Sequence, residues 1–374
     1  MHFALFTFLI LFSYVYISLV LFMPYSVLTK AFSGVLIILI CLKFIIYEKI
    51  GGFFIAPDFP STLILLMEIM YSTVVIMLFL LVVKDIYLIT AWGAKYMGLS
   101  NLPAVSPVVR NNVIAGAAFL LALLGTYNSM KVPDVKTVEV KIKNLPAELD
   151  GLSIVQLTDI HIGPLLKKDW LEKVVDKTNA LEPDIIAVTG DIIDGSPDEL
   201  AEDIAPLKDL RAKYGVYGVH GNHEYYFDDT VWGPVFEGFG IKMLENEHEV
   251  VPVEGTEIVL AGVNDRKASR YNRPAPDIEK ALKGSPEVPR ILLAHRPEFY
   301  SDKVDLQLSG HTHGGHLFFM KPLVGHFNGN LVGGLYRTGD TAQLYLSAGT
   351  GIWAGFSCRL GVDSEITRIL LRGE

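Results

Sequence analysis

Cysteine is nearly absent from this sequence. The two that occur, Cys41 and Cys358, lie far apart, and there is no Cys-x-x-Cys pair. Isolated thiols of this kind indicate no disulfide framework and cannot assemble a thiolate metal cluster. Any metal site in this chain must therefore be built from histidine, aspartate and asparagine side chains.

Acidic residues are scarce in the first third of the chain. Those before Met130 are Glu48, Asp58, Glu68 and Asp85, whereas the whole sequence holds 41 aspartates and glutamates and carries a net charge of −9. The chain therefore divides into a part suited to lipid and an acidic part suited to water. The acidic part would repel nucleic-acid phosphates, and no basic run with interleaved aromatic residues offsets that repulsion. We expect no nucleic-acid partner.

Long hydrophobic runs fill the N-terminal part. A helix needs about 20 mainly apolar residues to cross the hydrocarbon core, because bare peptide groups cannot stay unbonded in lipid. Residues 1–130 are thus expected to form an α-helical transmembrane domain of four spans, at 3–22, 31–47, 61–83 and 113–127. The first run lacks the basic n-region and cleavage site of a signal peptide. The fourth, rich in alanine and glycine, also suits an interfacial helix. The basic residues do not decide the orientation of the chain.

Two charged residues interrupt the apolar runs. Lys43 lies near the end of the second run and Glu68 near the start of the third, so an up-down hairpin would place them at similar depth. An unpaired charge is costly there, and we hypothesise that the two side chains face each other. The alternative is that Lys43 extends to the membrane surface while Glu68 faces an aqueous cavity.

The texture of the sequence changes from Thr137 onward. Short β-branched runs alternate with amphipathic stretches, which predicts an α/β domain, a layered β-sandwich flanked by helices. Residues 131–150 would hold a linker and the first strand, and residues 151–374 the domain. The expected strands are 138–142, 153–157, 185–188, 216–219, 258–263, 290–294, 306–308, 343–346 and 365–371, and the expected helices are 167–180 and 198–211.

Polar side chains follow five of these strands. In open α/β sheets the strand ends are where ligands bind, so five loops would converge on one crevice. The candidate metal ligands in these loops are Asp159, His161, Asp191, Asn222, His295, His311 and His313. Seven ligands are too many for one ion. Carboxylate, amide oxygen and imidazole together suit Mn, Fe or Zn. Taken singly, His295 also suits a structural histidine and Asp159 a helix cap, but the joint arrangement favours two ions that share one carboxylate.

The order of these motifs has a known parallel. Asp-x-His, Gly-Asp-x-x-Asp, Gly-Asn-His-Glu, a lone histidine after a strand and then Gly-His-x-His resemble the calcineurin-like binuclear metallophosphoesterases from about residue 152 to the C-terminus. The resemblance implies that a first metal is held by Asp159, His161 and His313. It implies that a second metal is held by Asn222, His295 and His311. Asp191 would bridge the two ions, and His223 would lie beside the substrate oxygen.

The chemistry of such a site can be stated. Two cations about 3.5–4 Å apart lower the pKa of a shared water and hold the phosphoryl oxygens, so that hydroxide can attack phosphorus. Asp191 would fix their spacing, and His223 would protonate the leaving oxygen or stabilise the developing charge. Glu224 and Asp194 are expected to orient imidazoles or amides. The glycines at 190, 221 and 310 would permit sharp turns.

Two residues carry weaker signals for substrate binding. His316 stands where similar sequences often carry glutamine, and it would contact substrate or be a surface imidazole. Arg359 would recognise a second phosphate bidentately or form a structural salt bridge.

The hydrophobic runs suggest the kind of substrate. Holding a hydrolase at the bilayer makes most sense if its substrate is in the membrane, and the membrane-associated branch that the chain resembles includes UDP-diacylglucosamine pyrophosphatases of lipid A synthesis. We therefore expect a lipid-linked phosphoester or pyrophosphate as substrate and a bacterial inner-membrane location, with the face left open. Trp353, Phe356, Phe318 and Phe319 would receive acyl chains or belong to the core. The alternatives are a phosphodiesterase or phosphatase for soluble substrates and a non-catalytic membrane sensor. The sequence does not indicate the oligomeric state.

Overall fold

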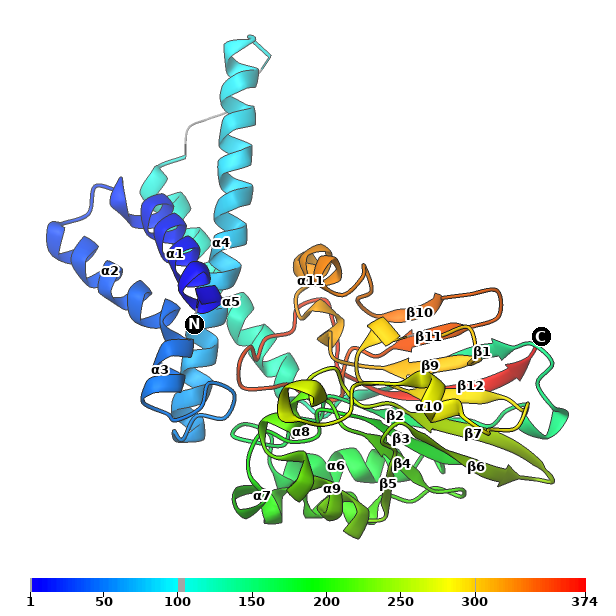
Figure 1. Ribbon diagram of the computed structural model, residues 1–374. Coiled ribbons are helices and arrows are strands. Elements are labelled where there is room, and N and C mark those ends of the chain that lie inside the picture. The colour runs from blue at the N-terminus through cyan, green and yellow to red at the C-terminus, as the bar shows by residue number, and fades with distance from the viewer. Residues whose placement is uncertain (1, 100–104, 300) are drawn as a thin grey trace. The chain divides into compact units, whose positions relative to one another are not determined.

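The chain folds into two compact units (Figure 1). The computed structural model describes residues 2–99, 105–299 and 301–374. The helical unit comprises the N-terminal residues up to Asn128 together with the short segment Ala354–Cys358. The α/β unit comprises Ser129–Trp353 and Arg359–Glu374. Residues 354–358 therefore belong to the helical unit, although their neighbours in sequence belong to the α/β unit.

The helical unit contains five α-helices among the described residues. They are α1 (His2–Tyr16), followed by a π-helical turn at Ile17–Leu21, then α2 (Val27–Cys41), α3 (Lys43–Lys49), α4 (Ser61–Tyr96) and α5 (Pro107–Met130). Helices α4 and α5 are each long and apolar enough to cross a membrane, and α2 with α3 makes a third candidate if this bent pair counts as one span. A further apolar helix is counted over Phe8–Leu21, where it is shorter than these candidates within the residues whose side chains are described. The described residues thus give two to three candidate spans where the hydrophobic runs predict four.

The second expected span is bent where its charged residue occurs. Helix α2 ends at Cys41, and α3 starts at Lys43 with a change of direction of 58°. The Lys43 Nζ donates a hydrogen bond to the Glu68 Oε1 of α4 at 2.7 Å, and both side chains are fully buried. The hypothesis of a Lys43–Glu68 pair is confirmed, and the alternative in which Lys43 extends to the membrane surface is wrong.

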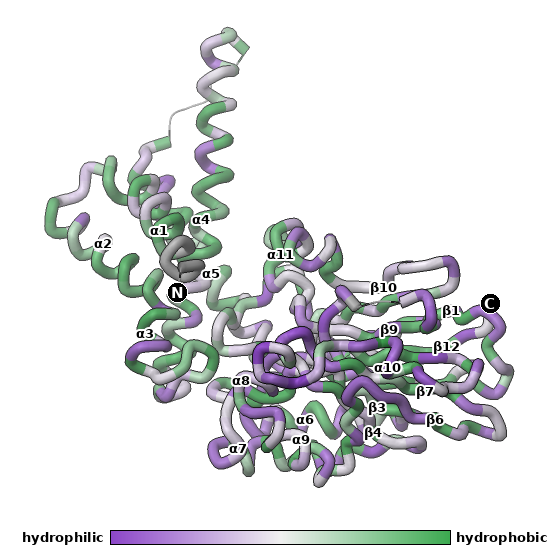
Figure 2. Tube along the Cα trace, viewed as in Figure 1, coloured by the Kyte–Doolittle hydropathy of each residue, from purple (hydrophilic) through white to green (hydrophobic). Residues whose placement is uncertain are grey.

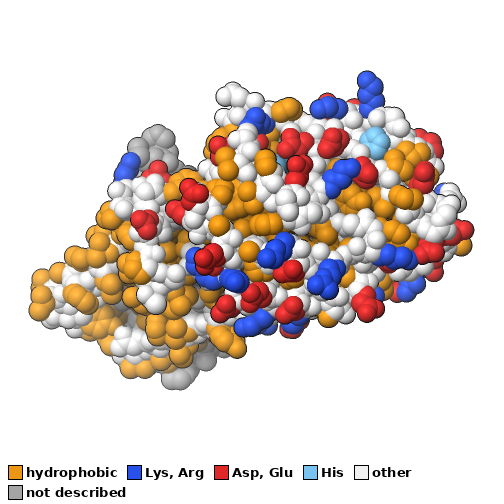
Figure 3. Space-filling model, turned by 90° about the horizontal axis from the view of Figure 1, so that it is seen from below, with side chains coloured by type: hydrophobic (Ala, Val, Ile, Leu, Met, Phe, Trp, Pro, Cys, Tyr) orange, Lys and Arg blue, Asp and Glu red, His pale blue; other side chains and the backbone are white. Residues whose placement is uncertain are grey.

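The two units differ in where their hydrophobic residues lie. Figure 2 shows the helices α2 to α5 hydrophobic along most of their length, whereas hydrophobic and hydrophilic residues alternate through the α/β unit. On the face shown in Figure 3, hydrophobic side chains gather over the helical unit and charged side chains are spread over the α/β unit. Large apolar side chains such as Phe32, Trp92 and Leu120 are exposed on the helices. An apolar outer surface of this extent suits lipid as the surrounding solvent.

The α/β unit contains two six-stranded sheets. The first has the order β1-β12-β2-β3-β4-β5, and the second has the order β10-β11-β9-β8-β7-β6. The strands β2, β3, β4 and β5 are parallel, and so are β7, β8, β9 and β11. The strand bounds are β1 (Asp134–Ile142), β2 (Ser153–Leu157), β3 (Ile185–Thr189), β4 (Val216–Val219), β5 (Ile241–Met243), β6 (Glu247–Val253), β7 (Thr256–Gly262), β8 (Arg290–Leu293), β9 (Leu306–Ser309), β10 (Gly334–Arg337), β11 (Gln343–Leu346) and β12 (Glu365–Gly373).

Short helices complete the α/β unit. They are α6 (Lys168–Asn179), α7 (Pro197–Ile204), α8 (Asn222–Tyr226), α9 (Asp229–Gly238), α10 (Ile278–Leu282) and α11 (Lys321–Phe327). The helix expected at 198–211 ends at Ile204 and continues as a 3-10 turn, because Pro206 cannot donate the next helical hydrogen bond.

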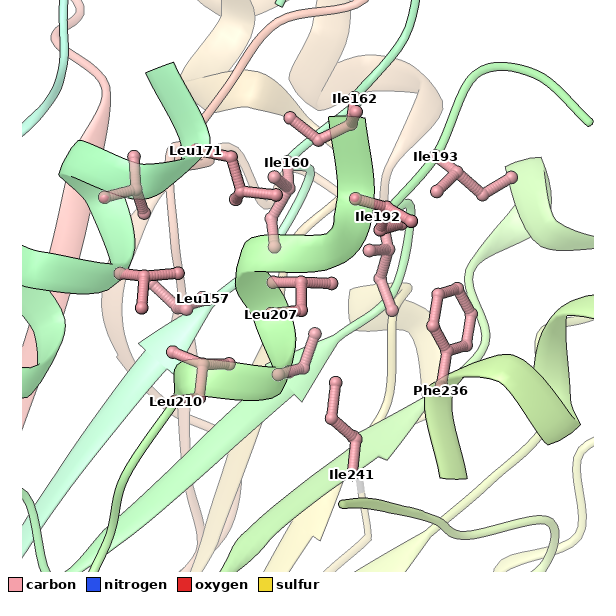
Figure 4. Close-up of a cluster of buried hydrophobic side chains, with 14 of the residues drawn as sticks. Leu157, Ile160, Ile162, Leu171, Ile192, Ile193, Leu207, Leu210, Phe236 and Ile241 are labelled. Carbon is pink, nitrogen blue, oxygen red and sulfur yellow. The ribbon is translucent and has the colours of Figure 1, made fainter. Parts of the chain in front are cut away.

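Successive side chains of a strand point to opposite faces of the sheet, and on the first sheet the side chains of both faces are buried in a hydrophobic core. Ile154 and Ile185 lie in a buried cluster that also contains Ile291 and Leu306 of the second sheet, so the two sheets enclose this cluster between them. The residues on the opposite face pack against helices. In Figure 4, Leu157 of β2 and Ile241 of β5 belong to a cluster that includes side chains of α6 and α9. The layered β-sandwich flanked by helices is therefore present.

All nine expected strands form, and three more were not expected. The additional strands β5, β6 and β10 are all at the edges of their sheets. An edge strand is often short or carries polar residues and proline, because one of its sides forms no backbone hydrogen bonds with a neighbouring strand. Strand β6, for example, contains Pro252 and three charged or titratable residues at its start. Such strands lack the β-branched pattern by which the others are predicted.

Candidate metal centre

The polar loops after the parallel strands converge as expected. Strands β2, β3 and β4 run in one direction in the first sheet, and β8 and β9 do so in the second. The loops that follow them carry Asp159, Asp191, Asn222, His295 and His311. The first four of these side chains are buried, and His311 is half-buried. Groups far apart in the sequence therefore meet in one shielded place.

One group of ligand atoms is formed by Asp159, His161 and His313. Their ligand atoms all lie within 4.8 Å of one another. The Nε2 atoms of His161 and His313 are 3.3 Å apart, and the His313 Nε2 is 3.4 Å from the Asp159 Oδ1. Burial, together with the nearby His316 and His161 rings, lowers the pKa of His313 well below its ordinary value. A neutral imidazole is the form that binds a metal.

A second group is formed by Asp191, His295 and His311, again within 4.8 Å. The His295 Nδ1 lies 2.9 Å from the Thr189 carbonyl oxygen, which can only accept, so this nitrogen carries the proton. The other nitrogen, Nε2, then faces the Asp191 Oδ2 at 3.2 Å and has no hydrogen-bond partner among the described residues.

Without a proton, the His295 Nε2 and the Asp191 Oδ2 both present lone pairs and repel each other. A cation between the two atoms removes this repulsion. Burial alone would lower the pKa of His295, but Asp191 and Asp159 outweigh it and raise the pKa to about 10. The surroundings of the Asp191 carboxylate therefore stabilise a positive charge next to it, either a proton on His295 or a metal ion. Asp191 is itself held in place, since its Oδ1 accepts a hydrogen bond from the His223 backbone amide at 2.8 Å. The donor atoms of the two groups fit two divalent ions.

Arg296 was not identified from the sequence, and it contacts two candidate ligands. Its Nη2 donates to the Asn222 Oδ1 at 2.8 Å, and its Nη1 is hydrogen-bonded to the His311 Nε2. Its Nε donates to Asp265 at 2.8 Å. The guanidinium therefore supplies positive charge next to the ligands of the second group. Its position directly after His295 was the only sequence signal.

His223 lies beside both groups and is oriented by Asp194. The Asp194 Oδ1 is hydrogen-bonded to the His223 Nδ1 and lies 3.2 Å from the His161 Nδ1, so one carboxylate aligns two imidazoles. Burial alone would lower the pKa of His223, but Asp191 and Asp194 outweigh it and raise the pKa to about 9. The His223 Nε2 is 3.7 Å from the Asp191 Oδ2. This ring is therefore equipped to carry a proton.

Glu224 organises the backbone of two loops rather than imidazoles. Its Oε2 accepts from the amides of Gly221 at 2.6 Å and Asp191 at 3.0 Å, and its Oε1 accepts from Ile192 at 2.7 Å. Gly221 is required here for space, because a Cβ at this position would lie 2.2 Å from the Asp191 Oδ1. Gly310 is required in the same way beside Asp159. Of the three glycines expected in turns, Gly190 has a positive φ, at 84°.

Several candidate ligands have strained backbone conformations. The φ angles of Asp159, His161, Asp191, His311 and His313 lie between 48° and 76°. This left-handed region is unfavourable for residues with a Cβ, and such strain persists where the surrounding structure imposes it. Its concentration at the candidate ligands indicates that the loops impose the directions of these side chains.

Comparison with known proteins identifies the family. A family model described as calcineurin-like phosphoesterase matches residues 152–315, which include all seven candidate ligands. The chain is 32% identical over 342 residues to an uncharacterized metallophosphoesterase of Helicobacter pylori, an alignment that covers 87% of this chain and 90% of the relative. This chain belongs to the calcineurin-like metallophosphoesterase family. It is thus a metal-dependent phosphoester hydrolase by class, and its buried ligand groups fit the two divalent ions of dimetal members.

Two animal relatives of this metallophosphoesterase are named transmembrane proteins. A Bos taurus protein called "Transmembrane protein with metallophosphoesterase domain" is 34% identical over 313 residues, covering 77% of this chain and 68% of the relative. The Danio rerio protein of the same name is 38% identical over 266 residues, covering 68% of this chain and 60% of the relative. Together with the apolar helices described above, these relatives support association of this metallophosphoesterase with a membrane.

The two residues with weaker signals lie beside His313 in the metallophosphoesterase. His316 is half-buried and its ring stacks on His313 with centroids 4.8 Å apart, so it is not a surface imidazole. Arg359 is buried, and its guanidinium donates to the carbonyl oxygens of Ala348 at 2.8 Å, Gly351 at 3.0 Å and His313 at 3.3 Å. These contacts give Arg359 a structural role in holding the loop that carries His313.

The aromatic residues proposed to receive acyl chains are dispersed. Trp353 lies beside the centre, with its ring centroid 6.0 Å from that of His223. Phe356 belongs to the helical unit, where it packs edge-on against Tyr71. Phe318 is 61% exposed. Of these residues, Trp353 is the one placed next to the candidate ligands.

Proposed function

We propose that this metallophosphoesterase is anchored in a membrane and hydrolyses a phosphoester or pyrophosphate bond of a lipid-linked substrate such as UDP-diacylglucosamine. The supporting observation is that one chain combines a buried two-metal ligand cluster with long apolar helices. Under this proposal residues 1–130 form a transmembrane domain of four spans, the first of them at residues 3–22. Residues 131–150 hold the linker and first strand, and residues 151–374 the catalytic domain. The protein would serve lipid A synthesis in a bacterial inner membrane.

In this proposal the first ligand group holds one ion. Asp159, His161 and His313 supply one carboxylate and two imidazoles, and Asp191 adds a shared carboxylate. Asp191 lies 3.9 Å from His161 through its Oδ2 and 3.2 Å from His295 through the same atom, so it is near both groups. Bound divalent ions supply a nucleophile at neutral pH and neutralise the phosphoryl oxygens. Manganese suits this mixture of oxygen and nitrogen ligands.

The second ion would be held by Asn222, His295 and His311. Arg296 now occupies the Asn222 Oδ1 and the His311 Nε2, so an ion and the guanidinium compete for these two atoms. With these two atoms serving as ligands, the Arg296 guanidinium would be free to bind a phosphoryl oxygen of the substrate bidentately.

His223 would act as the general acid. Asp194 fixes its ring through Nδ1, which leaves Nε2 directed to the side of Asp191. A proton at Nε2 then passes to the leaving oxygen as the bond to phosphorus breaks. The stacked position of His316 next to His313 makes it a candidate for contact with a distal part of the substrate. Arg359 would act on the substrate only through the backbone that it holds.

Substrate class is tested on the purified full chain loaded with Mn²⁺. UDP-diacylglucosamine and phospholipids are supplied in mixed micelles, beside soluble nucleotides and an aryl phosphate, and phosphate or nucleotide release is measured. We expect lipid-linked substrates to be hydrolysed with the highest kcat/KM, and His223→Ala to remove the activity. Equal turnover of soluble nucleotides would instead establish a phosphodiesterase or phosphatase for soluble substrates. Bound metal without release from any substrate would establish a non-catalytic sensor.

A further inference from the structure

The segment Ala354–Cys358 is held in the helical unit by its backbone. The Lys43 Nζ donates to the Gly355 carbonyl oxygen at 2.6 Å, and the Ser357 backbone amide donates to the Glu68 Oε2 at 3.1 Å. The segment thus meets both members of the buried ion pair, each through the backbone group of matching polarity. Among the side chains of the segment, Phe356 packs edge-on against Tyr71.

The Lys43–Glu68 ion pair is in turn stabilised by the segment, because backbone groups of the segment complete the hydrogen bonds of both side chains. A buried lysine and carboxylate are stable only when their remaining hydrogen-bonding capacity is met. Glu68 uses Oε1 for Lys43 and the Tyr47 hydroxyl at 3.1 Å, and Oε2 for Ser357. Both Lys43 and Glu68 are fully buried, so water cannot replace the backbone groups of the segment. Removal of either charge therefore leaves the other with too few partners and releases the segment.

The residues that flank the segment lie at the metal centre of the α/β unit. Trp353, one residue before it, places its ring edge-on to His223, the proposed general acid. Arg359, one residue after it, holds the His313 loop through the contacts described above, and its Nη2 lies 3.3 Å from the His313 Nδ1. Each flank is separated from the segment by a single peptide bond. Displacement of the segment in the helical unit is thereby transmitted along the chain to both flanks.

We propose that Lys43 and Glu68 are positioning residues for the metal centre. By fixing Ala354–Cys358 they set Trp353 against His223 and Arg359 against the His313 loop, so the helical unit is part of the catalytic apparatus and not only an anchor. The effect on hydrolysis rests on the proposed function, whereas the effect on the segment and on His313 does not. A misplacement of about 1 Å can cost a catalytic group up to about 10²-fold in rate.

The test compares Lys43→Met with wild type in the full, membrane-extracted chain. We expect faster amide hydrogen exchange at 355–358, above all at Ser357, a weaker first Mn²⁺ site by electron paramagnetic resonance, and a kcat reduced about 10- to 100-fold with KM changed little. The matched control is Asp85→Asn, which breaks another ion pair of the helical unit, between the Lys84 Nζ and the Asp85 Oδ1 at 3.1 Å. This change should leave the hydrogen exchange, the Mn²⁺ site and the kcat unchanged.

A charge swap separates positioning from simple stability. Lys43→Glu with Glu68→Lys keeps an ion pair but presents a carboxylate to the Gly355 carbonyl and an ammonium group to the Ser357 amide. We expect the swapped protein to stay folded, as judged by its thermal unfolding, while fast exchange and low kcat persist. Wild-type kcat in the swapped protein, or unchanged Ser357 exchange in Lys43→Met, would overturn the proposal. If the wild type hydrolyses nothing, exchange and Mn²⁺ affinity still decide it.

Discussion

Charge is buried in both units of this metallophosphoesterase, but the two burials differ in what balances them. In the helical unit, Lys43 meets Glu68 directly, and the backbone of 354–358 completes the hydrogen bonds of both. In the α/β unit, the carboxylates of Asp159 and Asp191 face imidazole nitrogens of His313 and His295. The first cluster is complete within the chain, whereas the donor atoms of the second fit metal ions.

This difference shows how burial of charge can serve two ends. A complete cluster contributes a fixed geometry, because any change leaves a charge without partners. A cluster of metal-binding donor atoms instead contributes affinity for a metal ion. The favourable interaction between its negative charges and the ion becomes binding free energy. The strained φ angles at the candidate ligands of the second cluster show that the loops impose the directions of these side chains.

The largest effect is expected from Asp191→Asn. This change removes the carboxylate closest to both ligand groups, so Mn²⁺ should no longer stabilise the chelator-treated protein and hydrolysis should be abolished. In the wild type, Mn²⁺ at 100 times its dissociation constant should add about 2.7 kcal/mol of stability. Thermal unfolding with and without Mn²⁺ measures both. A full Mn²⁺ shift in Asp191→Asn would contradict the view that this cluster is incomplete without metal.

His223→Ala should lower kcat by about 10²- to 10⁴-fold, the usual contribution of a general acid. Metal content should remain at two ions per chain, since His223 is not among the proposed ligands. Single-turnover hydrolysis and elemental analysis give the two quantities. Loss of an ion together with the rate would instead make His223 a ligand, and would enlarge the metal-dependent cluster by one residue.

Asp194→Asn should have a smaller effect, about 10- to 100-fold on activity or metal affinity, as found for residues that orient ligands. The amide oxygen is neutral, so it holds the Nδ1–H groups of His161 and His223 less strongly than the carboxylate does, and each ring is less firmly oriented. Metal titration and kinetics on the same sample report the two losses separately. Activity equal to wild type would show that the imidazoles are oriented without this carboxylate.

The smallest effect is expected from Glu365→Gln, a buried carboxylate of the α/β unit that already has its partners. Burial would raise the pKa of Glu365, but hydrogen bonds from Lys136 and Tyr345 outweigh it and hold the pKa below 4.5. The lowered pKa stabilises the fold above pH 4.5, and this contribution is lost as pH falls through the folded-state pKa. The variant should be about 1–3 kcal/mol less stable at neutral pH.

Two controls accompany this last change. The difference in unfolding free energy between Glu365→Gln and wild type should shrink as the pH falls below 4.5. The Mn²⁺ shift should be the same in both proteins, because Glu365 is complete without metal. A difference that grows in acid would mean that Glu365 is protonated in the native state.

Much of the α/β unit was predictable because its information is local. Buried parallel strands are continuous apolar runs, and the polar residue after each run marks the edge where the loops meet, as at Asp159 and Asp191. The edge strand β6 was missed because Pro252 and its charged residues weaken that pattern. In the helical unit, the shared depth of Lys43 and Glu68 led to the hypothesis of their pairing but left open the alternative in which Lys43 extends to the membrane surface.

What the sequence could not reveal depends on contacts between distant segments. Arg296 looks like any residue after a strand, and its importance follows from the positions of Asn222 and His311 in three dimensions. Residues 354–358 are bound to the helical unit through backbone groups, which every residue possesses. No pattern of side chains marks such a segment in advance.

The length of α4 has a consequence for the shape of any membrane complex. At 1.5 Å per residue, its 36 residues extend for about 54 Å, whereas the hydrocarbon core is about 30 Å thick. A tilt of about 40°, the upper end of the usual range, still leaves a vertical rise of roughly 41 Å. A bilayer crossed by α4 therefore leaves at least two turns of helix outside the hydrocarbon core, at the depth of the headgroups, where lipid headgroups or a partner can contact them.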